Sequence, residues 1–98
     1  MEAHALWIRF TIKEGHMKEF MEAAMYDAKH SMEDEKGCQH FRVMTKEDEP
    51  NNVYFLEVYD SKEDHALHRT MPHYDVFAEV ADRVVDDRQR NELIIHNP

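Results

Sequence analysis

The sequence predicts an α+β domain with the ferredoxin-like order β-α-β-β-α-β, in which a four-stranded antiparallel sheet carries helices on one face. Apolar residues alternate with a period of two in the first two strand segments, a third segment is aromatic and β-branched, and apolar residues recur at helical spacing in between. Glycines number only 2 and prolines 3, so the few chain breaks are informative. The length of 98 residues predicts one domain, residues 1–98.

The first strand is predicted over residues 5–13, where one side carries Leu6, Ile8, Phe10 and Ile12. The opposite side is not purely polar, because it carries Trp7. The strand ends at Glu14-Gly15. Both faces of the sheet therefore have apolar side chains to bury.

The first helix is predicted over residues 17–32, with the apolar stripe Met17, Phe20, Met21, Ala24, Ala28 and Met32. Asp27 is expected away from this stripe, among the charged residues. Gly37 is expected to close the helix in a left-handed conformation, which glycine adopts without strain.

Two strands are predicted over residues 39–46 and 53–59, joined as a hairpin by the polar turn 47–52. In the first, Phe41 and Val43 share one side. Tyr54, Leu56 and Val58 share a face with Trp7 if the strands pair in register. Such an apolar sheet face, left uncovered by helices, predicts a homodimer packed sheet to sheet.

The second helical region is predicted to be broken. Ser61 is a suitable N-cap with Asp64 three residues later, and Pro72 is tolerated only in the first turn of a new helix. The second piece has the apolar stripe Tyr74, Phe77, Ala78, Ala81, Val84 and Val85. A short last strand is predicted over residues 93–96.

The charge balance restricts the partners. There are 12 basic and 21 acidic residues, a formal net charge of -9, which disfavours nucleic acid and anionic membranes. A single cysteine, Cys38, excludes an intrachain disulfide, and residues 1–10 resemble neither a signal peptide nor a membrane span. We therefore expect a cytoplasmic protein that binds a small molecule.

Candidate catalytic residues concentrate between Glu57 and Tyr74, at the predicted junction of a strand and two helices. His68 falls near the end of one helix, where the helix dipole favours imidazolium, and His73 near the start of the next, where it favours neutral imidazole. Histidines with pKa values separated in this way suit an acid/base pair, with Glu57 beside them.

Structural roles are the alternatives for the same residues. Glu57 could instead hold Arg9 or Arg42, and both histidines could serve only as hydrogen-bonding groups. A metal site is not expected, because His65 should point outward beside Glu63 and Asp64; the remaining histidines, including His4, are expected at the surface.

A resemblance to a known family rests on Gly37-Cys38, Phe41, Glu57-x-Tyr59, Ala66-x-His68 and His73-Tyr74. From about Phe10 to Phe77 the chain resembles the antibiotic biosynthesis monooxygenase superfamily, close to its quinol monooxygenases and phospho-autoinducer-2 isomerases. The resemblance implies a dimeric α/β barrel and a pocket between sheet and helices. It also implies oxidation without metal or flavin, so no cofactor is expected.

The resemblance implies site residues as well. His68, His73 and Glu57 would be catalytic, and the substrate would contact Phe41, Tyr59, Tyr74 and Trp7. Haem-degrading members are expected to carry a pocket tryptophan in the second half of the fold. The only tryptophan here is Trp7, which disfavours haem degradation.

Three functions remain open from the sequence. The first is a cofactor-independent monooxygenase acting on a quinol or polyphenol. The second is an isomerase of a small phosphorylated ligand, for which only Arg42 and Arg69 are evident as phosphate-binding residues. The third is a dimer that binds a small ligand without catalysis.

Overall fold

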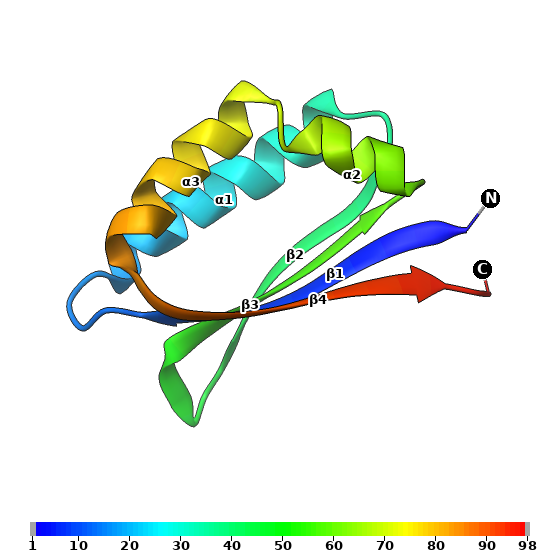
Figure 1. The fold of residues 1–98 in the computed structure, drawn as a ribbon. Helices are drawn as coiled ribbons and strands as arrows, with labels where there is room; N and C mark the ends of the chain where they lie inside the picture. The colour runs from blue at the N-terminus through cyan, green and yellow to red at the C-terminus, as the bar shows by residue number, and fades with distance from the viewer. Residues whose placement is uncertain (1, 98) are drawn as a thin grey trace.

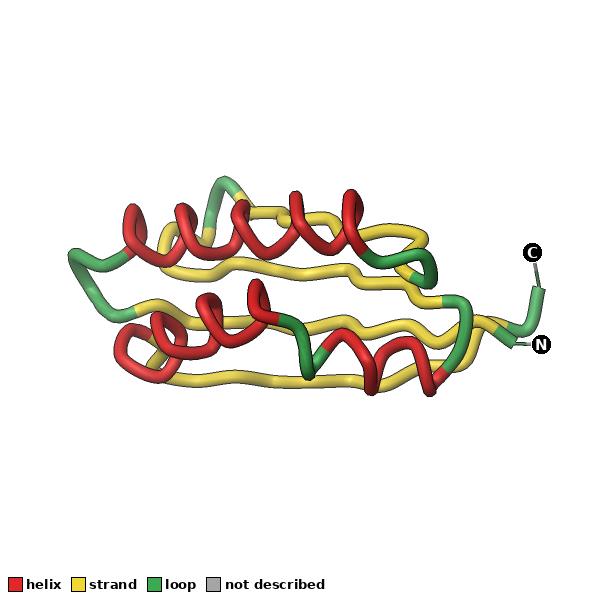
Figure 2. Tube along the Cα trace, turned by 90° about the horizontal axis from the view of Figure 1, so that it is seen from above, coloured by secondary structure: helices red, strands yellow, loops and turns green. Residues whose placement is uncertain are grey.

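A four-stranded antiparallel sheet with helices on one face makes up the chain, as predicted (Figure 1). The computed structural model describes residues 2–97. Its elements, in order, are β1 (Ala3–Ile12), α1 (Met17–Asp34), β2 (Cys38–Lys46), β3 (Glu49–Tyr59), α2 (Lys62–His68), α3 (Pro72–Val84) and β4 (Val85–Ile95). Figure 2, seen from the helical side, shows α1 as one row and α2 with α3 as a second row across the strands.

The strand order is β2-β3-β1-β4, so the two central strands are the first and third in sequence. The register pairs Leu6 of β1 with Glu57 on one side and with Glu92 on the other. Because side chains alternate along a strand, these three share the face that the helices cover. Trp7 pairs with Leu56 on the opposite face.

The core lies between the helices and the inner sheet face. Phe10 is its centre, with ring centroids 4.7 Å from Phe55, 5.2 Å from Phe20 and 5.9 Å from Phe77. The alternation predicted for β1 is confirmed, since Leu6, Ile8, Phe10 and Ile12 are all buried. This cluster of rings holds α1 and α3 against the sheet, mainly by removing apolar surface from water.

The outer sheet face has no helix over it. Trp7 is 40% exposed there, and its ring centroid lies 6.0 Å from that of Tyr54. Val58 is already buried within the chain itself.

Two strands are longer than their sequence patterns predict. β3 begins at Glu49 rather than residue 53, and β4 begins at Val85 rather than residue 93. β4 pairs along nearly all of β1, although its residues 86–92 are polar and exposed. Backbone hydrogen bonding needs no apolar side chain, so an edge strand of this kind escapes a search for alternating hydrophobic residues.

Helix α1 differs in two respects from the expectation. Asp27 and Ser31 are buried, whereas Met32 is 40% exposed.

No helix within residues 2–97 has the length and apolarity needed to cross a membrane. The capped starts are confirmed: the Ser61 side chain accepts a hydrogen bond from the Asp64 amide, and Pro72 opens α3.

Gly37 is required for a different reason from the one predicted. Among the described glycines only Gly15 has a positive φ, of 83°, so Gly37 is not left-handed. A Cβ at position 37 would instead come within 2.7 Å of the Asp64 side chain. The absence of a side chain thus allows the start of β2 to approach α2.

We expect Gly37→Ala to lower the free energy of unfolding by about 1–3 kcal/mol, because the added methyl group overlaps Asp64. Urea denaturation measures the loss. The neighbouring exposed residue provides the control, since Lys36→Ala should change stability by less than about 0.5 kcal/mol. Equal stability of the two variants would contradict the close approach.

Candidate functional site

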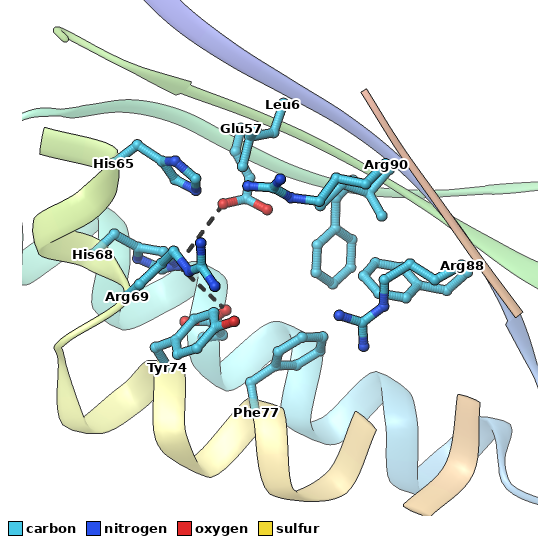
Figure 3. Close-up of a pocket in the computed structure, with 13 residues that line it drawn as sticks. Leu6, Glu57, His65, His68, Arg69, Tyr74, Phe77, Arg88 and Arg90 are labelled. Carbon is cyan, nitrogen blue, oxygen red and sulfur yellow. Dashed lines mark ion pairs between the residues drawn. The ribbon is translucent and has the colours of Figure 1, made fainter. Parts of the chain in front are cut away.

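A cavity of about 160 Å³ opens between the sheet and the helices (Figure 3). Its apolar lining comes from both layers and comprises Leu6, Ile8, Phe10, Phe55, Tyr74 and Phe77. Its polar lining comprises Asp27, Glu57, His65, His68, Arg69, Arg88 and Arg90. The cavity therefore combines aromatic rings with a dense set of ionisable groups, as small-molecule sites do.

His68, the last residue of α2, is the best-connected polar group of this cavity. Its Nδ1 lies 2.8 Å from Glu35 Oε2. Its Nε2 lies 3.8 Å from Glu57 Oε1 and 4.0 Å from Asp27 Oδ2, the two pairs drawn as dashed lines in Figure 3. In the tautomer in which His68 Nδ1–H donates a hydrogen bond to Glu35, the Nε2 lone pair is free to act as a base.

Glu35 joins the two histidines that the sequence singles out. It caps the C-terminus of α1, and its Oε2 also lies 2.5 Å from His73 Nε2. His73 is buried but does not line the cavity, whereas His68 does. His68 is thus placed to touch a ligand. His73 can influence His68 only through the carboxylate of Glu35, which both histidines contact.

Burial controls the charge of the carboxyl groups around His68. It raises the pKa of Asp27 to about 8, with further contributions from the nearby Glu57 and Glu35 carboxylates. It raises the pKa of Glu57 to about 7, against the opposing hydrogen bond from Tyr59. Because carboxylates so close together cannot all ionise in a low dielectric, Asp27 holds a proton at neutral pH.

The expected charge of His68 is wrong. The sequence predicts an imidazolium at the end of a helix, but burial lowers the pKa of His68, and the Glu35 carboxylate opposes this only in part. Desolvation disfavours the charged ring more than the dipole of a seven-residue helix favours it. A neutral His68 is the form that can accept a proton.

Glu57 does not pair with Arg9 or Arg42. Its side chain faces the helices, and it accepts a hydrogen bond of 2.6 Å from the Tyr59 hydroxyl. Arg9 instead pairs with Asp87, at 2.9 Å, and Arg42 lies opposite Leu56 on the outer face. The alternative in which Glu57 only holds Arg9 or Arg42 is therefore wrong.

The four residues expected to contact substrate are separated by the fold. Tyr74 lines the cavity, with its ring 5.3 Å from that of His68. Phe41 and Tyr59 are buried behind His68, at 6.1 and 5.3 Å between ring centroids, and are not among the cavity-lining residues. Trp7 lies on the opposite face of the sheet, so it does not line this cavity.

Arginines are more numerous at the cavity than expected. Arg69, Arg88 and Arg90 all line it, while Arg42 is excluded by the direction of its side chain. The Arg88 guanidinium lies 5.0 Å above the ring of Phe10. Figure 3 shows Arg69 close to His68 and Tyr74, Arg90 beside Glu57, and Arg88 on the other flank of the cavity.

Two groups of side chains near the cavity have the composition of metal sites. One is Asp27, His68 and His73; the other is His4, His65 and Glu92. The expectation that His65 points outward and that His4 is at the surface is wrong, since they are 5% and 8% exposed. Their imidazole rings stack, with centroids 5.4 Å apart.

Sequence reasoning missed several of these residues, although some left a signal. Asp27, Ser31 and Glu35 recur at intervals of four, which places them on one side of α1. Arg88 and Arg90 alternate with period two, which places them on one face of a strand. The sequence shows that these residues share a face, but it does not show that this polar face would point toward the interior.

The sequence profile described as antibiotic biosynthesis monooxygenase matches residues 4–80. A search among curated proteins finds no match.

Several solved structures share the fold. A candidate antibiotic biosynthesis monooxygenase from Bacteroides thetaiotaomicron superposes with a TM-score of 0.91 at 20% identity, over 98% of this chain and 91% of that one. Another from Nitrosomonas europaea superposes with a TM-score of 0.86 at 20% identity, over 97% of this chain and 89% of that one. A candidate monooxygenase from Lactobacillus acidophilus gives 0.88 at 27% identity, over 95% of this chain but only 46% of that one.

Glu35→Gln should lower the pKa of His68 further, because the Glu35 carboxylate is what opposes the effect of burial. An NMR titration of the His68 ring resonances measures the change. Asp34→Asn is the matched control, since Asp34 is exposed and pairs with His30. An unchanged His68 pKa in Glu35→Gln would show that Glu35 does not set its basicity.

Asp27 should make stability fall as pH rises from 6.5 to 8. With a folded pKa of about 8 against about 4 when unfolded, the folded state holds the extra proton throughout this interval. The lowered histidine pKa values act below pH 6.5, where only the unfolded chain charges. Asp27→Asn should reduce this loss of stability in urea denaturation, and the exposed Asp86→Asn should not.

Proposed function

Because the chain belongs to the antibiotic biosynthesis monooxygenase family, we propose that it is a cofactor-independent monooxygenase acting on a small quinol or polyphenol. The pairing of Glu35 with His68 at the edge of an aromatic cavity is the observation that carries the proposal. A base held in this way can remove a phenol proton, and the resulting anion is a far better reductant than the phenol itself.

The proposed reaction balances without a further reductant. A quinol and O₂ give a hydroxyquinone and water: one oxygen atom is inserted into a ring C–H bond to form the new hydroxyl group, and the second leaves as water with the two original hydroxyl hydrogens. The substrate supplies all four electrons. His68 Nε2 takes the first proton, and the protonated Asp27 carboxyl, 4.0 Å away, is a proton donor for the departing oxygen.

The size and lining of the cavity favour a substrate with a single ring. A volume of about 160 Å³ matches the apolar cavities, near 150 Å³, that accept benzene. Phe10, Phe55, Phe77 and Tyr74 present the rings against which an aromatic substrate would stack. Glu57, with its pKa near 7, is positioned to hold a substrate hydroxyl.

The second candidate, an isomerase of a small phosphorylated ligand, is favoured by a specific observation. Arg69, Arg88 and Arg90 line the same cavity, and guanidinium groups bind phosphate oxygens in pairs. In that reaction His68 would move a proton between carbons next to a carbonyl group, and no oxygen would be consumed. The third candidate, a dimer that only binds its ligand, uses the same contacts without turnover.

We further propose that the protein is a cytoplasmic homodimer, packed through the outer sheet face that carries Trp7, Tyr54 and Leu56. Partly exposed apolar side chains on a face without helices are typical of an interface. Sedimentation velocity measures the mass in solution. A species of 11.8 kDa at micromolar concentration would contradict the dimer.

Oxygen uptake with a panel of single-ring hydroquinones tests the proposed function. His68→Ala should slow uptake by about 10²–10⁴-fold, the usual effect of removing a general base. His73→Ala should slow it less, because His73 acts only through Glu35. His16→Ala is the control, as this histidine is exposed and far along the chain from the site.

Adding a phosphorylated hydroxyketone to the panel separates the candidates. Exchange of a carbon-bound hydrogen of the phosphorylated hydroxyketone with solvent, without oxygen uptake, would identify the isomerase. Ligand binding with neither reaction would leave the binding dimer. Full oxygenase activity in His68→Ala would contradict the role of this residue whatever the substrate.

A further inference from the structure

The second group of metal-binding side chains, His4, His65 and Glu92, stands apart from the proposed catalytic residues. His4 lies near the start of β1, His65 in the middle of α2 and Glu92 near the end of β4. His4 pairs with Ile94, and Glu92 lies two residues before Ile94 on the same strand. His4 and Glu92 therefore share the helix-covered face of the sheet as diagonal neighbours on adjacent strands. Three elements distant in sequence thus bring two imidazoles and one carboxylate together.

The three side chains converge on one point. His4 Nε2 lies 3.7 Å and His65 Nδ1 4.0 Å from the same oxygen, Glu92 Oε1. The three candidate ligand atoms all lie within 4.8 Å of one another. Around a tetrahedral Zn²⁺ with bonds of 2.0–2.2 Å, ligand atoms are roughly 3.4 Å apart. Small side-chain rotations would therefore close the site.

An unpartnered nitrogen is the second, independent observation. His4 is 8% exposed, and its Nε2 has no hydrogen-bond partner among residues 2–97. A buried polar atom without a partner costs free energy, and such atoms are rare in folded proteins. The nitrogen is directed at Glu92, where a bound cation would satisfy it.

Arg90 is the cation nearest to the carboxylate of this site, and Lys62 lines a surface depression beside it. Arg90 Nη2 lies 2.9 Å from the same Glu92 oxygen, so a metal ion would compete with this ion pair. Glu92 is 47% exposed, and exposed ion pairs contribute little free energy. The displaced guanidinium would still have the cavity beside it, which Arg90 already lines.

We propose that His4, His65 and Glu92 form a binding site for a divalent first-row transition-metal ion of the Zn²⁺ type. Two nitrogens and one carboxylate oxygen match the preferences of these ions, and three protein ligands leave a coordination position open. A depression lined by His4, Ser61 and Glu92 gives access from solvent. The ion would cross-link β4, an edge strand, to β1 and α2.

The site lies beside the catalytic cavity rather than within it. His65 lines the cavity as well, and its ring centroid lies 6.3 Å from that of His68. In the competing group Asp27, His68 and His73, Glu35 already engages His68 Nδ1 and His73 Nε2, and none of its atoms is a buried unpartnered one among residues 2–97. A third group, His30, Glu33 and Asp34, is largely exposed and has no unpartnered buried atom.

Titration of the metal-free protein with Zn²⁺, followed by competition with a chromophoric chelator, tests the proposal. We expect one equivalent to bind and the thermal midpoint to rise by roughly 10 °C at a hundredfold excess over the dissociation constant. Co²⁺ should give the visible absorption of a low-coordinate nitrogen and oxygen site.

Three variants locate the ion, and a fourth, His30→Ala, is the control. His4→Ala and Glu92→Gln should each weaken binding by about 10-fold or more, and Glu92→Gln preserves the shape of an exposed side chain, so folding is not in question. Arg90→Gln should tighten binding, because it removes the competing cation. His30→Ala, which removes the surface group, should leave binding unchanged.

The outcomes are distinct. Loss of binding in His4→Ala and Glu92→Gln, with retention in His30→Ala, supports the site. Unchanged stoichiometry and affinity in Glu92→Gln, or loss of binding in His30→Ala, would overturn it. Neither result depends on which reaction the adjacent cavity performs.

Discussion

The burial of Glu35 between His68 and His73 is the constraint on which the rest of the site depends. Its carboxylate oxygen lies 2.8 Å from one imidazole and 2.5 Å from the other, all three side chains being almost fully buried. Removing one partner from such a group leaves an uncompensated polar atom and typically costs about 3–5 kcal/mol. The ends of α1, α2 and the start of α3 are thereby held in one relative position.

This constraint explains why the second helical region is broken. A continuous helix would carry His68 and His73 five positions apart, on different sides, and only one could reach Glu35. Pro72 starts a new helix, so that His73 turns back toward the end of α1. Gly37 adds the close approach of β2 to α2. The helix break before Pro72 is thus needed for both histidines to reach Glu35.

The cavity brings acidic and basic side chains close together. Asp27, Glu35 and Glu57 surround His68, and burial keeps part of them protonated. Arg69, Arg88 and Arg90 line the same space. A site with a base, a proton donor and guanidinium groups can serve several reactions on small anionic or phenolic molecules. The fold alone therefore does not choose among the proposed oxygenase, the isomerase and the binding dimer.

The sequence by itself determined the order of elements, the inward faces of β1 and β3, the capped start of α2 and the break at Pro72, because these follow from local periodicity and backbone chemistry. Only the tertiary structure decided that His65 and His4 are buried, that Glu35 and Asp27 face inward, and that Trp7 lies away from the cavity. The stretch from Glu57 to Tyr74 was visible as a concentration of reactive groups, but the carboxylate that organises its histidines comes from the end of α1. A polar residue is buried when a partner distant in sequence satisfies it, and no local pattern records that partner.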